Sequence, residues 1–346
     1  MLKREELMPF VFASLAVVVA LIYTFINGFH DGGNVLATMI SSQALSIRYA
    51  FFIGAVSEFI GAFFFGGAIA KTISIGIVNP NLITIWAILA GLTGAIIWNL
   101  ITWWWGFPSS SSHALIGGLL GASIIDSFLI RGQIWQVIHW HNLIWIFIVL
   151  FTSPFIGLSL GFVLTKLIFF IGRGLSPKVN KTFKRLQVLS SIFIGISHGS
   201  NDAPKAMGVI IMSLMLLGTY HLQESFVIPL WVILICAFSF SFGVFKASRR
   251  LIRTLGIELY KIRPVHGFIS QTSSAFIVGL SSLTGFPVST TQIVNSSIMG
   301  AGAGHRVKAI RWGIIRNIFI TWLVTIPGAA IIAILFYLLI HWLFGF

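Results

Sequence analysis

The sequence predicts an all-α membrane protein, an inverted-repeat helical bundle with two re-entrant-type helical hairpins and a broken first helix in each repeat. Three observations lead to this prediction. Of the 346 residues, 57% are hydrophobic and only 9% are charged, a composition that excludes an ordinary water-soluble domain. The apolar runs are continuous and do not alternate with period two, which favours helices over a β-barrel. Two motifs recur along the chain, which indicates an internal duplication.

Most of the apolar runs are long enough to cross or re-enter a bilayer, and short polar loops separate them. We expect the first run to stay as a permanent helix, because no small-residue cleavage site follows the stretch from Pro9 to Ile26. The predicted helical segments are residues 9–45, 50–70, 82–105, 109–128, 142–171, 187–217, 227–245, 265–283, 288–303 and 312–344.

Basic residues orient the bundle. The chain has 22 Lys and Arg against 8 Asp and Glu, a formal net charge of +14. These basic residues gather in short loops, as the positive-inside rule expects of cytoplasmic loops, so nucleic-acid binding is disfavoured. We therefore expect a multi-pass protein of the cell inner (plasma) membrane with both termini outside the cytoplasm, and with loops 71–81 and 131–141 also outside. The basic clusters are Arg173, Lys178, Lys181, Lys184 and Arg185; Lys246, Arg249, Arg250, Arg253, Lys261 and Arg263; and Arg306, Lys308, Arg311 and Arg316.

The duplication rests on two pairs of motifs. Gly106-Phe107-Pro108, followed by four serines, recurs as Gly285-Phe286-Pro287, 179 positions later, followed by Val288 and three hydroxyl residues. His30-Asp31-Gly32-Gly33-Asn34 corresponds to Asn201-Asp202-Ala203-Pro204-Lys205, 171 positions later.

These motifs divide the chain into two repeats and a linker. The first repeat is residues 1–172 with a hairpin at 82–128, and the second is 187–346 with a hairpin at 265–303. The segment 173–186 is a basic cytoplasmic linker. Each half has three net crossings, and an odd number turns the second copy upside down, an arrangement typical of secondary transporters with a substrate site near the midplane.

Three carboxylates fall inside apolar segments. A charged residue at the centre of a membrane helix costs about 2.5–3.5 kcal/mol on insertion scales, so it usually faces a partner or an ion pathway. Asp31 and Asp202 recur at matched positions and are interpreted as part of such a pathway. Glu58 has no acidic counterpart in the second half, so a structural role and a functional role stay open for it. Gly32-Gly33 and Pro204 predict that the helices carrying the aspartates are broken.

Each Gly-Phe-Pro motif predicts a tight turn followed by a helix start with hydroxyl side chains. Unpaired N–H groups, the positive end of the helix dipole and the hydroxyls together form an anion cradle. We expect the two tips, one from each side of the membrane, to meet around a tetrahedral oxyanion. The alternative is that the hydroxyl clusters only hold helices together in lipid.

Lys205 occupies the position that Asn34 has in the first repeat. It follows Asp202 by three residues and lies on the same helical face, so it either neutralises that aspartate or replaces a bound cation. For His113, interhelical hydrogen bonding and proton relay both stay open.

These residues resemble the PiT family of inorganic phosphate transporters, and the resemblance covers nearly the whole chain. It implies a fold of inverted repeats with two hairpins. It also implies that Ser110, Ser111, Ser112, Ser289, Thr290 and Thr291 cradle phosphate, and that Asp31, Asn34, Asn201, Asp202 and Glu58 belong to the coupling-cation region.

The motifs also depart from the sodium-coupled members of that family. His30 precedes the first aspartate and Lys205 replaces an asparagine, which is similar to the proton-coupled bacterial branch. The resemblance therefore implies H⁺ as the co-transported cation, with His30 as a relay, and Na⁺ as the alternative. That branch is thought to carry phosphate partly as a neutral complex with Mg²⁺ or another divalent metal, and no resident cofactor is expected.

A charge count supports cation coupling. If Asp31, Asp202 and Glu58 are ionised and Lys205 is charged, three negative charges and one positive charge give −2. A phosphate dianion takes this to −4, which cannot cross a low-dielectric barrier without compensation.

The same residues bear on four other possibilities. Buried carboxylates favour phosphate, which has a proton to donate, over sulfate, although a sulfate permease of the same fold stays an alternative. An intramembrane serine protease is disfavoured, because adjacent Ser112 and His113 point about 100° apart on a helix. A passive anion channel gains nothing from paired carboxylates. A homo-oligomer stays an open alternative.

Overall fold

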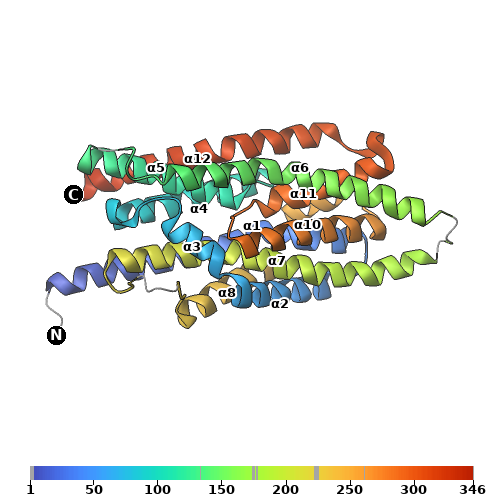
Figure 1. Ribbon diagram of the computed structural model, residues 1–346, viewed down its shortest axis with the longest axis horizontal. Coiled ribbons are helices and arrows are strands. Elements are labelled where there is room, and N and C mark those ends of the chain that lie inside the picture. Colours follow the sequence, from blue (N-terminus) through green and yellow to red (C-terminus); the bar gives the residue numbers. More distant parts are fainter. Residues whose placement is uncertain are drawn as a thin grey trace.

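The computed structural model describes residues 4–132, 134–173, 176, 178–221, 226–260 and 262–345. Within these residues the chain is almost entirely helical (Figure 1). Its helices are α1 (Arg4–Ser41), α2 (Ile47–Phe65), α3 (Gly67–Ile75), α4 (Ile85–Trp105), α5 (Ser111–Arg131), α6 (Trp140–Ile171), α7 (Val179–Leu216), α8 (Leu230–Phe245), α9 (Arg249–Arg253), α10 (Pro264–Thr284), α11 (Thr290–Arg306) and α12 (Trp312–Phe344). Parts of the predicted linker and Lys261 lie outside the described residues.

The helices form an elongated bundle, and both chain termini lie at one end of it (Figure 1). The pair α4 and α5 lies toward that end, and the pair α10 and α11 lies toward the opposite end. Among the described residues, six helices are long and apolar enough to cross a membrane, or seven if α8 and α9 count as one bent span. The predicted all-helical membrane protein is confirmed.

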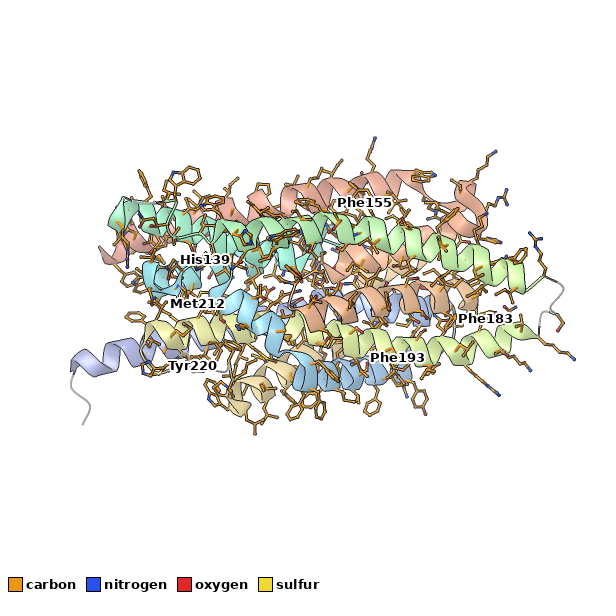
Figure 2. The ribbon with its side chains drawn as sticks, in the orientation of Figure 1. His139, Phe155, Phe183, Phe193, Met212 and Tyr220 are labelled. Atoms are coloured by element: carbon orange, nitrogen blue, oxygen red, sulfur yellow. The ribbon has the colours of Figure 1, made fainter. Side chains whose placement is uncertain are left out.

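The outside of the bundle is apolar and the inside is unusually polar. Phe155 on α6 and Phe193 on α7 are 63% and 55% exposed, whereas Met212 is buried (Figure 2). Buried Ser, Thr, Asn, His, Asp and Lys side chains lie along the inner faces of α1, α7 and the two hairpins. A bundle with an apolar exterior and a polar interior matches a lipid-facing surface that surrounds a hydrophilic pathway.

The predicted break in the first helix of each repeat is wrong. Both α1 and α7 run for 38 residues without interruption, through Asp31 and Asp202. Glycines reduce helix propensity but do not end a helix, and here Gly32 provides space for close packing: a Cβ there would lie 3.0 Å from the Cβ of Ala247. Pro204 removes one backbone donor, a loss that packed membrane helices tolerate.

The breaks fall one element later. The second span of the first half stops at Phe65, and α3 continues from Gly67. The second span of the second half, α8, is followed by α9 at a bend of 60°. Each half therefore has a long helix, an interrupted helix, a helical hairpin and another long helix, in that order.

The two hairpin turns have the same local structure. Gly106 and Gly285 end the first arms in the left-handed region, with φ of 73° and 78°. Only glycine adopts such angles without strain. Ser110 and Ser289 then cap the second arms, since their Oγ atoms accept from the backbone N–H groups of the residues three positions later, at 3.2 and 3.3 Å. The predicted turn and helix start are present in both halves.

Candidate functional site

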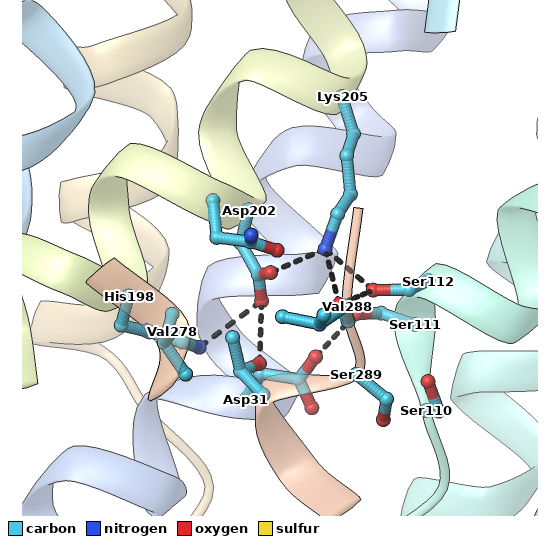
Figure 3. A network of polar contacts seen from close by, with 12 residues as sticks. Asp31, Ser110, Ser111, Ser112, His198, Asp202, Lys205, Val278, Val288 and Ser289 are labelled. Carbon is cyan, nitrogen blue, oxygen red and sulfur yellow. Dashed lines mark hydrogen bonds and ion pairs between the residues drawn. The ribbon is translucent and has the colours of Figure 1, made fainter. Parts of the chain in front are cut away.

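The two hairpin tips meet beside Asp31 on α1 and Asp202 on α7, where their side chains are buried (Figure 3). Ser112, at the start of α5, donates from Oγ to the carbonyl oxygen of Val288 at 2.9 Å. Lys205 on α7 donates from Nζ to the same carbonyl oxygen at 3.2 Å. The expected contact between the tips is therefore present, and a charged side chain spans it.

Asp31 on α1 accepts hydrogen bonds from both tips. The Oγ of Ser111 donates to its Oδ2, and the Oγ1 of Thr291 donates to its Oδ1 at 2.9 Å. The Nδ1 of His30 lies 2.9 Å from the same Oδ1. With 1% of the residue exposed, this carboxylate relies on protein groups for stabilisation.

Asp202 on α7 accepts a hydrogen bond from the tip of its own half and pairs with Lys205. The Oγ1 of Thr290 donates to its Oδ2 at 3.0 Å. The Nζ of Lys205 lies 2.5 Å from Oδ1, so the ion pair that the sequence offered as one role for Lys205 is present. Both residues are fully buried. A buried pair of this kind needs further hydrogen bonds to offset desolvation, and the tips supply them.

Asn34 and Lys205, which the sequence places at equivalent positions, make equivalent contacts with opposite tips. Asn34 donates from Nδ2 to Thr291 at 2.9 Å, and Lys205 donates from Nζ to Ser112 at 2.5 Å. Thus the aspartate of each long helix bonds the tip of its own half, and the residue three positions later bonds the tip of the other half. Asp31 differs from Asp202 in that it also accepts from the other tip, through Thr291.

Two of the six predicted cradle residues have a different main role. Ser110 and Ser289 cap α5 and α11, so their oxygens accept from the backbone and shape the tips. Asn201 donates to Ser281 at 3.1 Å on the first arm of the second hairpin. The structure therefore brings Ser111, Ser112, Thr290 and Thr291 together with Asp31, Asn34, Asp202 and Lys205, and keeps Asn201 at the edge.

His198 is the site residue that the sequence analysis missed. Its Nδ1 lies 2.9 Å from Oε2 of Glu58 on α2, and its Nε2 lies 3.0 Å from Oδ2 of Asp202. Glu58, His198 and Asp202 are fully buried. The available signal was the spacing of His198, one helical turn before Asp202, but the partner on α2 is visible only in the fold.

The two contacts of His198 are unequal. Its Nδ1 hydrogen-bonds Glu58, whereas its Nε2 faces Asp202 without hydrogen-bond geometry. An imidazolium between two carboxylates gives the trio of Glu58, His198 and Asp202 a net charge of −1, and a neutral ring beside two carboxylates gives −2. The other oxygen of Glu58, Oε1, has no hydrogen-bond partner among the described residues, so this carboxylate keeps an acceptor available.

His30 reaches the turn of the first hairpin with its second nitrogen. Its Nε2 lies 3.3 Å from Oγ1 of Thr102 and 3.4 Å from Oγ of Ser109. Both hydroxyls can donate or accept, so they do not fix which ring nitrogen carries hydrogen. His113 lies behind the tips, where its Nδ1 is 3.5 Å from the Nε2 of Gln292, its counterpart 179 positions later.

Buried acids, one ammonium group and two facing helix starts, enclosed in a bundle with an apolar exterior, define a membrane protein that moves a polar solute. The sequence model of the Phosphate transporter family matches residues 27–333. The chain belongs to this family, and it is a transporter and not an enzyme.

Relatives that align with nearly the whole of this chain support the assignment. A probable low-affinity inorganic phosphate transporter of Bacillus subtilis is 39% identical over 333 residues, covering 95% of this chain and 97% of the relative. One from Mycobacterium tuberculosis is 40% identical over 96% of this chain and 78% of the relative. One from Rhizobium meliloti is 38% identical over 93% of this chain and 94% of the relative.

A solved structure has the same fold. It is titled the sodium-dependent phosphate transporter, and it superposes with a TM-score of 0.85 at 24% identity, over 96% of this chain and 99% of that chain. At this identity the likeness establishes the arrangement of the helices.

Proposed function

We propose that this chain imports inorganic phosphate by proton symport and that phosphate binds between the two hairpin tips. The observation that carries the proposal is the convergence of two helix N-termini and four hydroxyls on Asp31, Asp202 and Lys205. The relatives named as probable low-affinity inorganic phosphate transporters support the substrate and suggest a low affinity.

The tips offer the groups that a tetrahedral oxyanion needs. As at every helix N-terminus, the first N–H groups of α5 and α11 have no acceptor within the helix, and they lie at the positive ends of the helix dipoles. The hydroxyls of Ser111, Ser112, Thr290 and Thr291 and the ammonium group of Lys205 add mobile donors. Phosphate that binds here takes over donors that Asp31 and Asp202 now use.

This exchange of donors explains why a cation must accompany phosphate. An Asp31 carboxylate that gives up Ser111 and Thr291 becomes a buried charge with fewer partners, which costs several kcal/mol. A proton or a metal ion restores the balance. We propose a proton, held at the His30–Asp31 pair, because Lys205 already fills the corresponding cation position beside Asp202.

His198 bears on the charge count but not on the conclusion. With an imidazolium at His198, the trio of Glu58, His198 and Asp202 carries −1, Asp31 carries −1 and Lys205 carries +1, so the site holds −1; with a neutral ring it holds −2. A phosphate dianion brings the site to −3 or −4, and an accompanying proton or divalent metal lowers that charge. Phosphate that travels as a complex with Mg²⁺ is consistent with this requirement.

Sodium coupling is the second candidate, because the structure with the same fold is titled a sodium-dependent transporter. Near Asn34 and Asp31 the site offers amide and carboxylate oxygens of the kind that bind sodium. At the equivalent position near Asp202, Lys205 places an ammonium group. Sulfate is disfavoured as a substrate by the buried carboxylates, which repel an anion without a proton to share.

The proposed topology follows from the repeats and the basic loops. Residues 1–172 and 187–346 are two inverted repeats, joined by a cytoplasmic linker at 173–186. Hairpins α4/α5 and α10/α11 re-enter from opposite faces, which agrees with their placement at opposite ends of the bundle (Figure 1). Both termini then lie outside the cytoplasm, in the inner membrane.

Transport by the purified protein in liposomes tests the substrate assignment. Uptake of radiolabelled phosphate should be saturable and should resist a large excess of sulfate. Equal competition by sulfate would contradict the assignment, and phosphate efflux that ignores pH, sodium and magnesium gradients would indicate a passive channel.

A further inference from the structure

Each hairpin turn is held by a threonine that lies outside the phosphate site. The Oγ1 of Thr254, which directly follows α9, donates to the carbonyl oxygen of Gly106 at 3.2 Å. The Oγ1 of Thr72 on α3 donates to the carbonyl oxygen of Gly285 at 2.6 Å. Gly106 and Gly285 are the left-handed residues that end the first arms, so the two contacts are made at the same place in each tip.

The two contacts correspond through the repeat. Thr72 and Thr254 are 182 positions apart, close to the spacings of the other motifs. Thr72 lies on the short helix after α2, and Thr254 lies directly after α9, the short helix that follows α8. In both halves, therefore, the short segment that follows the second long helix contacts the hairpin turn of the other half.

The two short segments also approach from opposite ends. In Figure 1, α3 lies toward the end that carries the chain termini, which is also the base of α4/α5. It covers the turn of α10/α11, whose base is at the other end. The proposed inverted repeat places α9 over the turn of α4/α5 from the end opposite to α3, where Arg250 lies against Gly106. Each turn is thus closed by one short segment on the side to which it points.

The segment after α8 makes one more hydrogen bond with its turn. Arg250 on α9 donates from its guanidinium group to the carbonyl oxygen of Trp104, and its Cζ lies 5.8 Å from the ring centroid of that tryptophan. The equivalent position on α3, 182 residues earlier, is Ala68, which has no donor side chain. The closing contacts are therefore made at the same place in each turn but differ in number.

A cavity of about 340 Å³ adjoins the Arg250 contact. It is lined by the turn residues Gly106 and Phe107, by Arg250 and Arg253, and by Asn317 on α12. Two guanidinium groups and an amide favour an oxyanion there. An oxyanion bound in this cavity would compete with the carbonyl of Trp104 for Arg250 and so weaken the contact that holds the turn.

We propose that Thr254 with Arg250, and Thr72, are positioning residues that hold the two tips closed, each toward one face of the membrane. Release of the Thr254 contact opens the α4/α5 tip only toward the face with the basic 246–263 segment. Release of the Thr72 contact opens the α10/α11 tip only toward the opposite face. This inference rests on the proposed binding of phosphate at the tips.

Thiol labelling from each face tests the proposal without relying on transport. The chain has one cysteine, Cys236, so C236A provides a background for reporters. S109C and V288C place a thiol at equivalent and buried positions of the two tips. A membrane-impermeant maleimide is applied to intact cells and to inverted vesicles. Mass spectrometry of the purified protein then gives the labelling rate.

We expect T254V to speed labelling of S109C about fivefold, the change for one lost hydrogen bond, only from the face that carries the 246–263 segment. T72V should speed labelling of V288C by a similar factor, only from the other face. T254S and T72S keep the hydroxyl and are the matched controls. R250A should act like T254V, and 10 mM phosphate should accelerate labelling of S109C in the chain with Arg250 intact but not in R250A.

Acceleration from both faces, or at the reporter of the other tip, would overturn the assignment, as would unchanged rates in both valine variants. The proposed function fails separately: if phosphate uptake is absent while the labelling stays face-specific, the closing contacts stand and the substrate assignment falls.

Discussion

Asn34 and Lys205 make the same contact on opposite sides of the site, since Asn34 Nδ2 is 2.9 Å from Thr291 Oγ1 and Lys205 Nζ is 2.5 Å from Ser112 Oγ. One side chain is neutral and the other is charged. The two halves therefore bind their tips with equal geometry and unequal charge. We infer that this asymmetry decides which cation accompanies phosphate.

The Lys205 position is the first point to test. Lys205→Asn restores the neutral amide and leaves Asp202 with His198 and Thr290 as partners. We expect proton-driven phosphate uptake to fall at least about tenfold and a dependence on sodium to emerge. The measurement is initial uptake in liposomes with pH and sodium gradients imposed separately. Proton-driven uptake that survives the change would show that Lys205 only neutralises Asp202.

The tip hydroxyls should determine phosphate affinity. Ser111→Ala and Thr290→Ala each remove a donor to an ionised partner, which is worth about 1.5–3 kcal/mol, so we expect KM for phosphate to rise about 10- to 100-fold. Ser153→Ala is the matched control, because this buried serine bonds only a carbonyl of its own helix at 3.2 Å. If KM is unchanged in both tip variants at normal expression, the tips do not bind phosphate.

His198 should stabilise the fold as well as the site. His198→Ala leaves the buried Glu58 carboxylate without its partner, a loss that typically costs about 3–5 kcal/mol. Adding Glu58→Gln removes the unpaired charge and should recover a large part of the melting temperature without recovering transport. A double variant as unstable as the single one would mean that the two side chains are not energetically coupled.

Asp126 offers a contrasting prediction, because it lies far from the tips. Its carboxylate accepts from the N–H of Thr84 at 3.0 Å, from the hydroxyl of Thr84 at 2.5 Å and from the hydroxyl of Tyr337 at 2.6 Å. We expect Asp126→Asn to cost about 1.5–3 kcal/mol of stability and to leave KM for phosphate unchanged. Thermal unfolding in detergent and uptake kinetics measure the two effects. A large rise in KM would contradict this prediction, because it would show that Asp126 affects phosphate binding.

The sequence was most informative where a chemical pattern is repeated. Two Gly-Phe-Pro turns and two aspartates in apolar runs located the tips and the acids, because a buried charge and a capped helix start depend on local residue types. The partner of Lys205 was also foreseeable, since Asp202 lies one helical turn away.

Sequence-based prediction failed for the features that depend on packing between helices. Gly32 and Pro204 predicted broken helices, but neighbouring helices keep α1 and α7 continuous, and the breaks fall after α2 and α8. His198 was overlooked because its second partner, Glu58, is 140 residues away and no local spacing reports that contact. The threonines that hold the turns were hidden for the same reason.

The most direct test of the account is accumulation of phosphate by the purified protein in sodium-free liposomes, with the outside acidified. We expect phosphate to accumulate above its equilibrium level, the accumulation to collapse with a protonophore, and Asp31→Asn to abolish it while the protein stays folded. Accumulation that requires sodium and is indifferent to the pH gradient would contradict proton coupling, and with it the role assigned to Lys205 and the His30–Asp31 pair.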